Sequence, residues 1–321
     1  MMEAHGQLLE KHMKVYYASA KKNKLLRLID MIVTFILKAR TVDVVIIAVY
    51  STLNFYYAYI LAMLCRIYRK PYIAYLHGGN LPTRLHKSPR LSRSIFAHSY
   101  ANVATSGYLK AAFIGAGYNA TIIPNFIEVD AYCYENVKNW EPKFIWVRAF
   151  EKTYHPEMAI YVLNELMKTY PNAQLCMVGP DKDGTKASCL ELATQLGLQG
   201  NVALTGSLSK SEWINISVNY NFFINTTHFD NTPVSIIEAM ALGLPIISTN
   251  VGGMPFLIEH GQEGLLSDDS DVPAMVKNIK RLLESPNLAE TLSRNARKKA
   301  ESFDWKLVEK QWIQLFSAIP Q

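Results

Sequence analysis

The stretch Asp230-Asn-Thr-Pro-Val-Ser-Ile-Ile-Glu-Ala-Met-Ala-Leu-Gly-Leu-Pro245 has the pattern of a helix that leads into a buried strand. Pro233 suits the first helical position, because its missing N–H would have no partner there. Thr232 or Asn231 can cap this helix. A glycine and a proline near the end of the stretch stop it, and the run Ile246–Thr249 that follows predicts a buried strand.

Two carboxylates of this stretch lie near the start of the expected helix. Asp230 precedes it, beside backbone N–H groups that have no partner within a helix, and Glu238 lies about a turn and a half further in. A helix N-terminus binds anions such as phosphate through these donors and through its dipole. We therefore expect a phosphate-bearing ligand here, with the two acids accepting hydrogen bonds from attached sugars.

The stretch resembles the signature of the retaining nucleotide-sugar glycosyltransferases of family 4. In that signature, two acidic residues separated by seven are followed by Ala-Met-Ala, a small residue, Gly, another residue and Pro. The first acid is Asp230 where Glu is usual. The resemblance runs from about residue 10 to the C-terminus. Further matching segments are Leu76–Gly79, Ile123–Asn125, Met177–Pro180, Asn201–Gly206, Thr249–Pro255 and Gly261–Leu266.

Strand and helix patterns alternate along the chain, which predicts parallel sheets covered on both faces and an α/β fold. The first set starts with a strand at Val15–Ser19 and a helix at 24–38. It continues with strands at 44–49, 71–76, 101–105 and 120–123 and helices at 52–66, near 90–98 and at 107–116. A second set begins at Phe144–Val147, with strands ending near 147, 178, 205, 225 and 249. The resemblance implies a GT-B-type fold, with two Rossmann-like domains facing a central cleft.

The domain division follows from this alternation and from the irregular segment 126–141, which is predicted to be the linker. Residues 1–135 are expected to form an acceptor-side Rossmann-like domain. The resemblance implies that it is incomplete, because the usual first strand and glycine loop have no counterpart. Residues 136–303 are expected to bind the nucleotide sugar. Residues 304–321 carry a final helix that the resemblance places against the first domain.

Composition is ordinary for a globular protein, with half of the residues hydrophobic and 19 % charged. The net charge of +6 hides an asymmetry: residues 1–125 hold 16 Lys or Arg and 4 Asp or Glu, and the remainder holds 17 and 23. The basic part suggests an anionic partner such as a membrane surface or a diphosphate-linked acceptor, or a solvated surface with no partner. No nucleic-acid motif accompanies the charge, so nucleic acid is not expected.

Two apolar segments in the basic part raise the question of membrane contact. Residues 44–65 contain no charged side chain, which is long enough for a span, but a β-branched run and a break favour a strand followed by a helix. In the helix at 24–38, polar residues form one narrow stripe on an otherwise apolar cylinder. Such a helix can lie on an anionic membrane or pack deep against a sheet. Four cysteines without paired metal spacing, and no signal peptide, favour the cytoplasm. If the anionic partner is a membrane, we expect peripheral attachment to its inner face.

The resemblance assigns roles to individual side chains. Asp230 would accept hydrogen bonds from donor-sugar hydroxyls near the anomeric carbon, and Glu238 from a ribose diol. Arg148 and Lys152 would grip the diphosphate, although Lys152 comes about one position early for the family and an exposed ion pair is a competing role. His77 would face the donor sugar, with a purely structural role as the alternative. Further predicted donor contacts are Asn231, Thr232 and Val234 at the helix start, and Gly179 and Gly206 at two strand ends.

No metal or other cofactor is expected. Asp181-Lys182-Asp183 mimics the Asp-x-Asp motif of other glycosyltransferases, but the resemblance places it in a loop away from the sugar. The resemblance implies sugar transfer from a nucleoside diphosphate to a hydroxyl with retention of configuration, in the assembly of a surface polysaccharide or glycolipid. The expected partners are the nucleotide sugar and a glycan or lipid-linked acceptor. The alternatives are a nucleotide-sugar epimerase or hydrolase of the same fold, or an inactive nucleotide-binding fragment.

Overall fold

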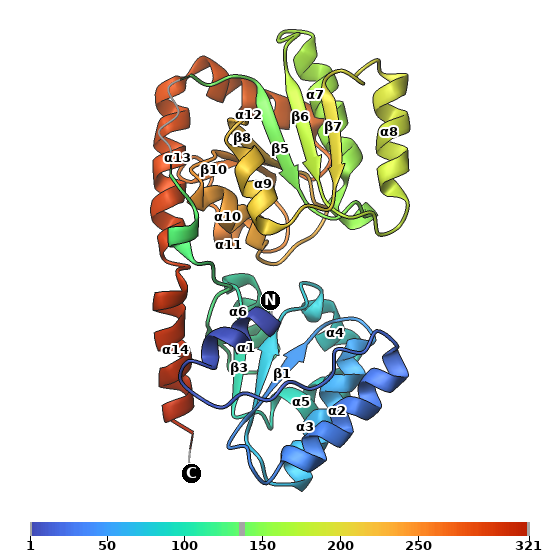
Figure 1. The fold of residues 1–321 in the computed structure, drawn as a ribbon, viewed down its shortest axis with the longest axis vertical. Coiled ribbons are helices and arrows are strands. Elements are labelled where there is room, and N and C mark those ends of the chain that lie inside the picture. The colour runs from blue at the N-terminus through green and yellow to red at the C-terminus, as the bar shows by residue number, and fades with distance from the viewer. Residues whose placement is uncertain (1, 135–138, 320–321) are drawn as a thin grey trace. The chain divides into compact units, whose positions relative to one another are not determined.

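The computed structural model describes residues 2–134 and 139–319 and divides into two compact units (Figure 1). The first unit comprises Met1–Pro124 and Lys306–Gln321, and the second comprises Asn125–Trp305. The division after Pro124 precedes the boundary at residue 135 that the sequence suggested. Part of the expected linker, residues 135–138, lies outside the described residues.

The first unit contains a parallel sheet in the order β1-β2-β3-β4. The strands are β1 (Val45–Val49), β2 (Tyr72–Leu76), β3 (Ala101–Ala104) and β4 (Thr121–Ile122). The helices are α1 (Met2–Leu9), α2 (Lys24–Lys38), α3 (Asn54–Ile67), α4 (Leu81–Lys87), α5 (Pro89–Phe96), α6 (Gly107–Gly115) and α14 (Trp305–Ser317). Every residue of β2 is buried, because this strand has a partner on each side and helices over its faces. The expected alternation is confirmed from β1 onward.

The strand expected at Val15–Ser19 is wrong. These residues adopt no strand, and none of them is fully buried. Ser19 has a φ of 69°, which interrupts an extended chain. A short β-branched and aromatic run becomes a strand only where a sheet edge receives it, and β1 pairs with β2 alone among the described strands.

The segment 44–65 forms β1 followed by α3, as its composition predicted. Asn23 caps α2 by accepting hydrogen bonds from the backbone N–H groups of Leu25 and Leu26. Among the described residues, no helix combines the length and the hydropathy that crossing a bilayer requires.

The second unit contains a six-stranded parallel sheet in the order β10-β9-β8-β5-β6-β7. The strands are β5 (Lys143–Val147), β6 (Gln174–Val178), β7 (Val202–Gly206), β8 (Phe222–Asn225), β9 (Ile246–Thr249) and β10 (Gly264–Ser267). The helices are α7 (Pro156–Met167), α8 (Thr185–Gln195), α9 (Lys210–Ser217), α10 (Val234–Ala241), α11 (Met254–Leu257), α12 (Val272–Glu284) and α13 (Pro286–Glu301). The predicted strand ends near 147, 178, 205, 225 and 249 are confirmed to within one residue.

Two separate cores cover the two faces of this sheet. Phe144 and Trp146 of β5 contribute to one core, which also contains residues of α7, α8 and α12. Ile145 lies in the other, with residues of α9, α10 and α11. Successive side chains of a strand point to opposite faces, so an unbroken apolar run in β5 supplies both cores at once.

Helix α10 begins one residue later than the sequence suggested. Pro233 is its N-cap, with φ −64° and ψ 123°. The N-cap position is therefore not held by Thr232 or Asn231, contrary to what the sequence suggested. The extended ψ of Pro233 turns its carbonyl into the first acceptor of the helix, for the N–H groups of Ile236 and Ile237. Gly243, at φ 81°, ends the helix as predicted.

Candidate functional site

The second unit brings two site residues together at the carboxyl ends of neighbouring strands. Arg148 directly follows β5, and Asp230 lies in the loop between β8 and α10. These two strands are adjacent, and the chain proceeds outward from them in opposite directions, to β6 on one side and to β9 on the other. Ligands of open α/β sheets bind at such a switch point, outside the carboxyl ends of the strands. The position marks the carboxyl ends of β5 and β8 as a candidate binding site.

Arg148 and Asp230 form an ion pair between Nη2 and Oδ2, with side chains only 16 % and 17 % exposed. Oδ1 of Asp230 accepts a hydrogen bond of 2.7 Å from the backbone N–H of Asn231. Burial lowers the pKa of Arg148 to about 10, so the guanidinium remains charged at neutral pH. It lies 4.7 Å from the ring centre of Tyr154. Its buried Nε finds no hydrogen-bond acceptor among residues 2–134 and 139–319, so the cation keeps an unused donor.

Glycines allow neighbouring backbone to approach these two residues. A Cβ on Gly179 would overlap the carbonyl oxygen of Arg148, and one on Gly253 would overlap that of Asn231. Gly252, at φ 54°, likewise leaves no room for a Cβ beside the Asp230 carbonyl. The backbone N–H of Gly253 donates to that carbonyl at 2.9 Å. Gly252 and Gly253 therefore fix the loop that carries Asp230, and Gly179 lets the end of β6 approach Arg148.

Glu238 lies on α10 and is nearly buried. Its Oε1 accepts a hydrogen bond of 2.7 Å from the hydroxyl of Tyr132 and lies 3.7 Å from Nζ of Lys210. Burial raises the pKa of this carboxyl above its usual value, while the contacts with Tyr132 and Lys210 act in the opposite direction. Nζ of Lys210 also lies 4.9 Å from the ring centre of Tyr132. A carboxylate, a cation and a phenol thus meet at one point.

Tyr132 and Lys210 were not singled out from the sequence. Lys210 follows Ser209, the N-cap of α9, which forms a capping box with Glu212. The Ser-x-x-Glu pattern can be recognised in the sequence and locates the start of α9, but it does not indicate that Lys210 has a partner on α10. Tyr132 stands in an irregular segment, where no periodicity indicates its direction.

Lys152 stands on the one-turn helix Lys152–Tyr154, and its side chain is exposed. Its backbone N–H donates to Asp183 at 3.0 Å. Asp183 also accepts from the backbone and hydroxyl of Thr185, and the hydroxyl bond lowers the pKa of the carboxyl. Asp181 accepts from the N–H of Gly184 at 2.9 Å. Both acids of the Asp-x-Asp pattern therefore stabilise a turn.

The other predicted donor contacts of this unit lie close to these groups. Thr232 is buried, and its carbonyl accepts a hydrogen bond of 3.0 Å from Asn125. Asn231 is buried beside Asp230, and Val234 opens α10. Gly206 ends β7 at φ 77°, and its carbonyl accepts from the N–H of Gly179 at 2.8 Å.

His77 belongs to the first unit, where it follows β2. Its ring stacks on Tyr50 at 5.6 Å between centroids and meets Tyr75 edge-on at 4.0 Å. Burial lowers its pKa to about 3, so the imidazole is neutral at physiological pH and acts through hydrogen bonds rather than charge. Its backbone N–H donates to Val49 at 3.0 Å.

One cluster in the second unit could hold a metal ion. Ligand atoms of His155, His228 and Asp269 lie within 4.8 Å of one another. Nδ1 of His228 lies 2.8 Å from Asp269, and the two imidazoles stack at 4.2 Å. The cluster includes none of the site residues predicted from the sequence.

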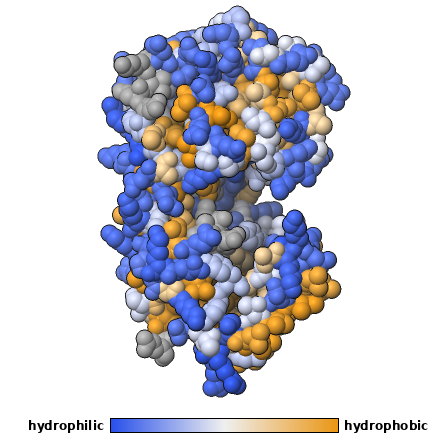
Figure 2. All heavy atoms as spheres, in the orientation of Figure 1, coloured by the Kyte–Doolittle hydropathy of each residue, from blue (hydrophilic) through white to orange (hydrophobic). Residues whose placement is uncertain are grey.

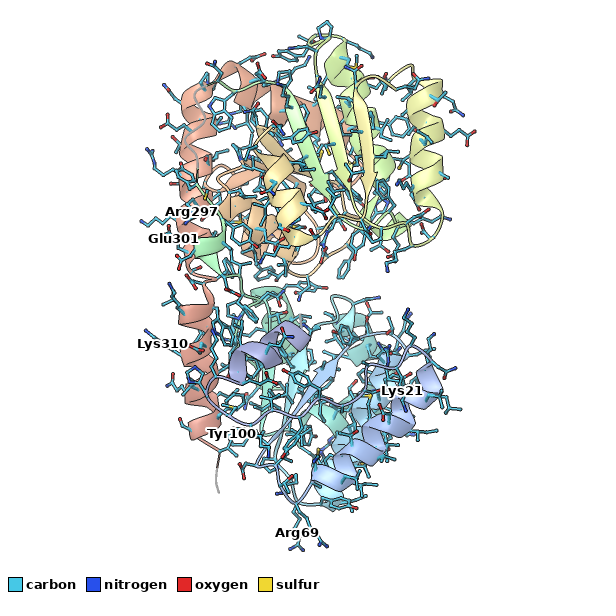
Figure 3. All side chains as sticks on the ribbon, in the orientation of Figure 1. Lys21, Arg69, Tyr100, Arg297, Glu301 and Lys310 are labelled. Carbon is cyan, nitrogen blue, oxygen red and sulfur yellow. The ribbon has the colours of Figure 1, made fainter. Side chains whose placement is uncertain are left out.

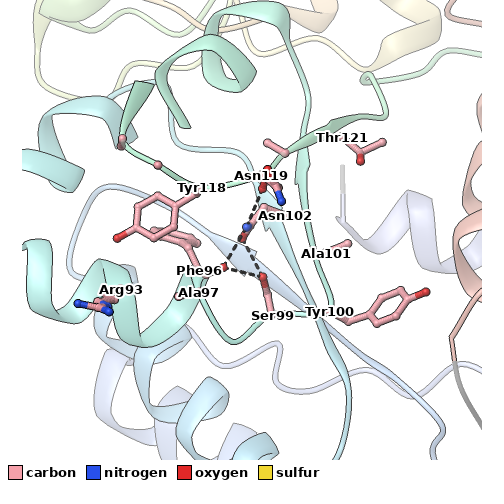
Figure 4. A pocket seen from close by; sticks show the side chains of 13 residues that line it. Arg93, Phe96, Ala97, Ser99, Tyr100, Ala101, Asn102, Tyr118, Asn119 and Thr121 are labelled. Atoms are coloured by element: carbon pink, nitrogen blue, oxygen red, sulfur yellow. Dashed lines mark hydrogen bonds between the residues drawn. The ribbon is translucent and has the colours of Figure 1, made fainter. Parts of the chain in front are cut away.

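A pocket in the first unit lies at the amino ends of β3 and β4 (Figure 4), whereas His77 follows the carboxyl end of β2. The side-chain amide of Asn102 donates to the carbonyls of Phe96 and Asn119, at 3.0 and 2.9 Å, and Ser99 donates to Asn102 at 3.0 Å. These bonds hold the loops before β3 and β4, and none of the predicted site residues lines the pocket.

Solved structures with the same fold include a sucrose-phosphate synthase from Thermosynechococcus elongatus, with a TM-score of 0.79 and 20 % identity. The match covers 93 % of this chain and 80 % of that one. HepE from Anabaena, in complex with UDP and glucose, matches with a TM-score of 0.76 and 20 % identity, over 97 % of this chain and 88 % of that one. These likenesses confirm the expected GT-B-type fold.

The chain spans less than half the length of the curated relatives it matches. The sulfoquinovosyl transferase SQD2 of Arabidopsis thaliana is 27 % identical over 153 residues, which is 47 % of this chain and 29 % of the relative. CapM of Staphylococcus aureus, a capsular polysaccharide biosynthesis glycosyltransferase, is 34 % identical over 92 residues, 29 % of this chain and 24 % of the relative. The model of the family "Glycosyl transferases group 1" matches residues 135–299, about half of the chain. With Arg148, Asp230 and Glu238 all inside that region, the chain belongs to the group 1 glycosyltransferases.

Proposed function

We propose that this protein transfers a sugar from a nucleoside-diphosphate donor to a hydroxyl acceptor, with the anomeric configuration retained. The observation that carries the proposal is the ion pair of Arg148 with Asp230 at the switch point of the second sheet. A buried cation with an unused Nε donor suits a diphosphate. The acid beside it suits the hydroxyls of the sugar that the diphosphate carries.

The positive groups at this edge would stabilise the leaving group. Arg148 can bind paired phosphate oxygens with its guanidinium, and Lys152 adds an exposed cation. The start of α10 would present its first N–H groups and the positive end of the helix dipole to the phosphates. As the bond from the anomeric carbon to the diphosphate oxygen breaks, these groups take up the negative charge. Because they supply this field, the proposed reaction needs no metal ion.

Retention follows if the acceptor attacks from the face that the diphosphate leaves. The acceptor oxygen then forms the new bond to the anomeric carbon, and its proton passes to the departing phosphate oxygen. The diphosphate acts as the base, so no dedicated protein base is required. Asp230 would orient the sugar through its hydroxyls during this step.

Glu238 would bind the ribose. A vicinal diol can donate two hydrogen bonds to one carboxylate, and the contacts with Tyr132 and Lys210 favour its ionised form. HepE was solved with UDP and with UDP-glucose, which makes UDP sugars the first donors to test. The name of CapM makes a surface polysaccharide or glycolipid the first acceptor to test.

Calorimetric titration of the full chain with UDP, GDP and ADP tests the donor site. We expect one nucleotide to bind, and Arg148→Met to lose at least about tenfold in affinity. Absence of binding, or equal binding by Arg148→Met, would contradict the proposal.

Turnover of the labelled donor sugar, with and without a lipid-linked acceptor, tests the reaction. A product of retained configuration that forms only with acceptor supports transfer. Free sugar or an epimer formed without acceptor would assign the site to a hydrolase or an epimerase, and binding without turnover to a nucleotide-binding module.

A further inference from the structure

Helix α2 exposes an apolar face. Only Phe35 of its 15 residues is buried. Six large apolar side chains are between 45 % and 70 % exposed: Leu25, Leu26, Ile29, Val33, Ile36 and Leu37. At 100° per residue these six span an arc of about 120°. The helix therefore turns a continuous apolar face outward, and the sequence-based alternative of a helix packed deep against a sheet is wrong.

The neighbouring helix extends this apolar surface. Tyr57 of α3 donates to the carbonyl of Lys24 at 2.9 Å, and Phe35 meets Tyr68 edge-on at 5.5 Å. The two helices thus lie side by side in the same direction. The exposed large apolar residues at the two ends of α3 are Leu53, Tyr56, Ile67 and Tyr68. Figure 2 shows the resulting apolar surface at the lower right, over α2 and α3.

Basic residues lie at both ends of this surface. Lys21, Lys22 and Lys24 stand at the start of α2, and all three are exposed. Arg66 and Arg69 lie at the end of α3, and both are exposed. Figure 3 shows Lys21 beside the start of α2 and Arg69 at the far end of the helix pair.

The negative charge on helix α2 is neutralised by a nearby lysine. Asp30, the one acidic residue of the helix, pairs with Lys21 at 3.5 Å. The border of the apolar face is therefore basic, within a part of the chain that carries 16 basic and 4 acidic residues over positions 1–125.

Charge decides between the occupants that such a face could take. A second copy of the chain would bring one basic border against another, which like charges oppose. An anionic bilayer offers acyl chains to the apolar face and negative headgroups to its border, and each basic residue near such a surface adds about 1 kcal/mol of attraction. Helix α2 has 15 residues, fewer than the about 20 that a membrane span requires, so it suits the interface rather than a crossing.

We propose that the apolar face of α2, together with the exposed ends of α3, lies in the interface of an anionic lipid bilayer, with the helix axis parallel to the membrane plane. Lys22, Lys24 and Arg69 contact the lipid headgroups. This inference does not depend on the proposed transfer reaction, because membrane binding is measured without donor or acceptor.

Flotation of the full chain with vesicles tests the proposal. Vesicles of equal parts phosphatidylcholine and phosphatidylglycerol should carry the protein upward, vesicles of phosphatidylcholine alone should carry little, and high salt should weaken binding. Ile29→Gln/Leu37→Gln, which changes the apolar face, and Lys22→Glu/Lys24→Glu, which changes its border, should each reduce partitioning at least about tenfold.

A matched control makes the same chemical change elsewhere. Leu190 and Val218 of the second unit are 59 % and 64 % exposed, and Leu190→Gln/Val218→Gln should float like the parent. Circular dichroism checks that every variant is folded. Equal flotation of the parent and both test variants, or no flotation of the parent, overturns the proposal. So does a dimer in solution that Ile29→Gln/Leu37→Gln dissociates while no vesicle binding is seen, because the face would then belong to a second copy.

Discussion

Replacing Arg148 by methionine should both destabilise the second unit and weaken nucleotide binding, and the two effects can be separated. Removing one partner of a buried ion pair costs about 3–5 kcal/mol of unfolding free energy. Asp230 is 17 % exposed and keeps its hydrogen bond from the Asn231 N–H, so we expect about 2–3 kcal/mol for Arg148→Met. For a unit of this size that corresponds to a fall in Tm of about 4–12 °C.

The double variant Arg148→Met/Asp230→Asn distinguishes the structural effect from the functional one. With both charges removed, no carboxylate is left buried and unpaired, so most of the lost stability should return. Nucleotide affinity should stay low, because the cation is still absent. Lys152→Met is the control, since its side chain is exposed and its removal should change stability by less than about 0.5 kcal/mol.

Urea denaturation of the four proteins, with calorimetric titration of UDP, GDP and ADP beside it, measures both quantities. Two results would refute the reasoning. If Arg148→Met is as stable as the parent, the ion pair does not hold the loop that carries Asp230. If the double variant recovers nucleotide affinity together with stability, Arg148 acts only by positioning that loop.

Further predictions concern three other positions. Burial raises the pKa of Glu238 above 4.5, so the folded state binds a proton more tightly than the unfolded state. The parent should therefore lose stability relative to Glu238→Gln as pH rises from about 4.5. Thermal melts at several pH values check this. Gly253→Ala should destabilise by about 2–4 kcal/mol, because its Cβ would overlap a backbone carbonyl, whereas Gly200→Ala, with open space around it, should change little; urea denaturation compares them. His77, with a pKa near 3, should show no protonation by NMR above pH 5, and its contribution to stability should fall as pH drops from about 6.5 toward 3.

Local patterns in the sequence predicted much of the fold. The stretch from Asp230 to Pro245 contains its own start, stop and following strand, and α10 and β9 appear where it placed them, apart from the cap at Pro233. Helix α2 was found with its bounds because its periodicity is strong. The prediction of a strand at Val15–Ser19 was wrong because a strand depends on a pairing partner far away in the sequence.

Contacts between distant residues were beyond such patterns. The positions of Arg148 and Asp230 could be suggested by resemblance, but their ion pair follows from the adjacency of β5 and β8, which the order of the chain does not state. The phenol of Tyr132 on Glu238 joins positions 106 residues apart. The exposure of α2 depended on which neighbours the fold supplied, and both alternatives for that helix were compatible with its sequence.

The division of β5 between two cores has a consequence for how this protein can vary. A shift of one residue along the strand would exchange the aromatic side chains of Phe144 and Trp146 with Ile145, and both faces of the sheet would lose their fit together. Insertions and deletions within β5, from Lys143 to Val147, are therefore not tolerated. The guanidinium of Arg148 directly follows this strand, so its position is as constrained as the strand itself, and variation of the candidate site has to come from the loops around it.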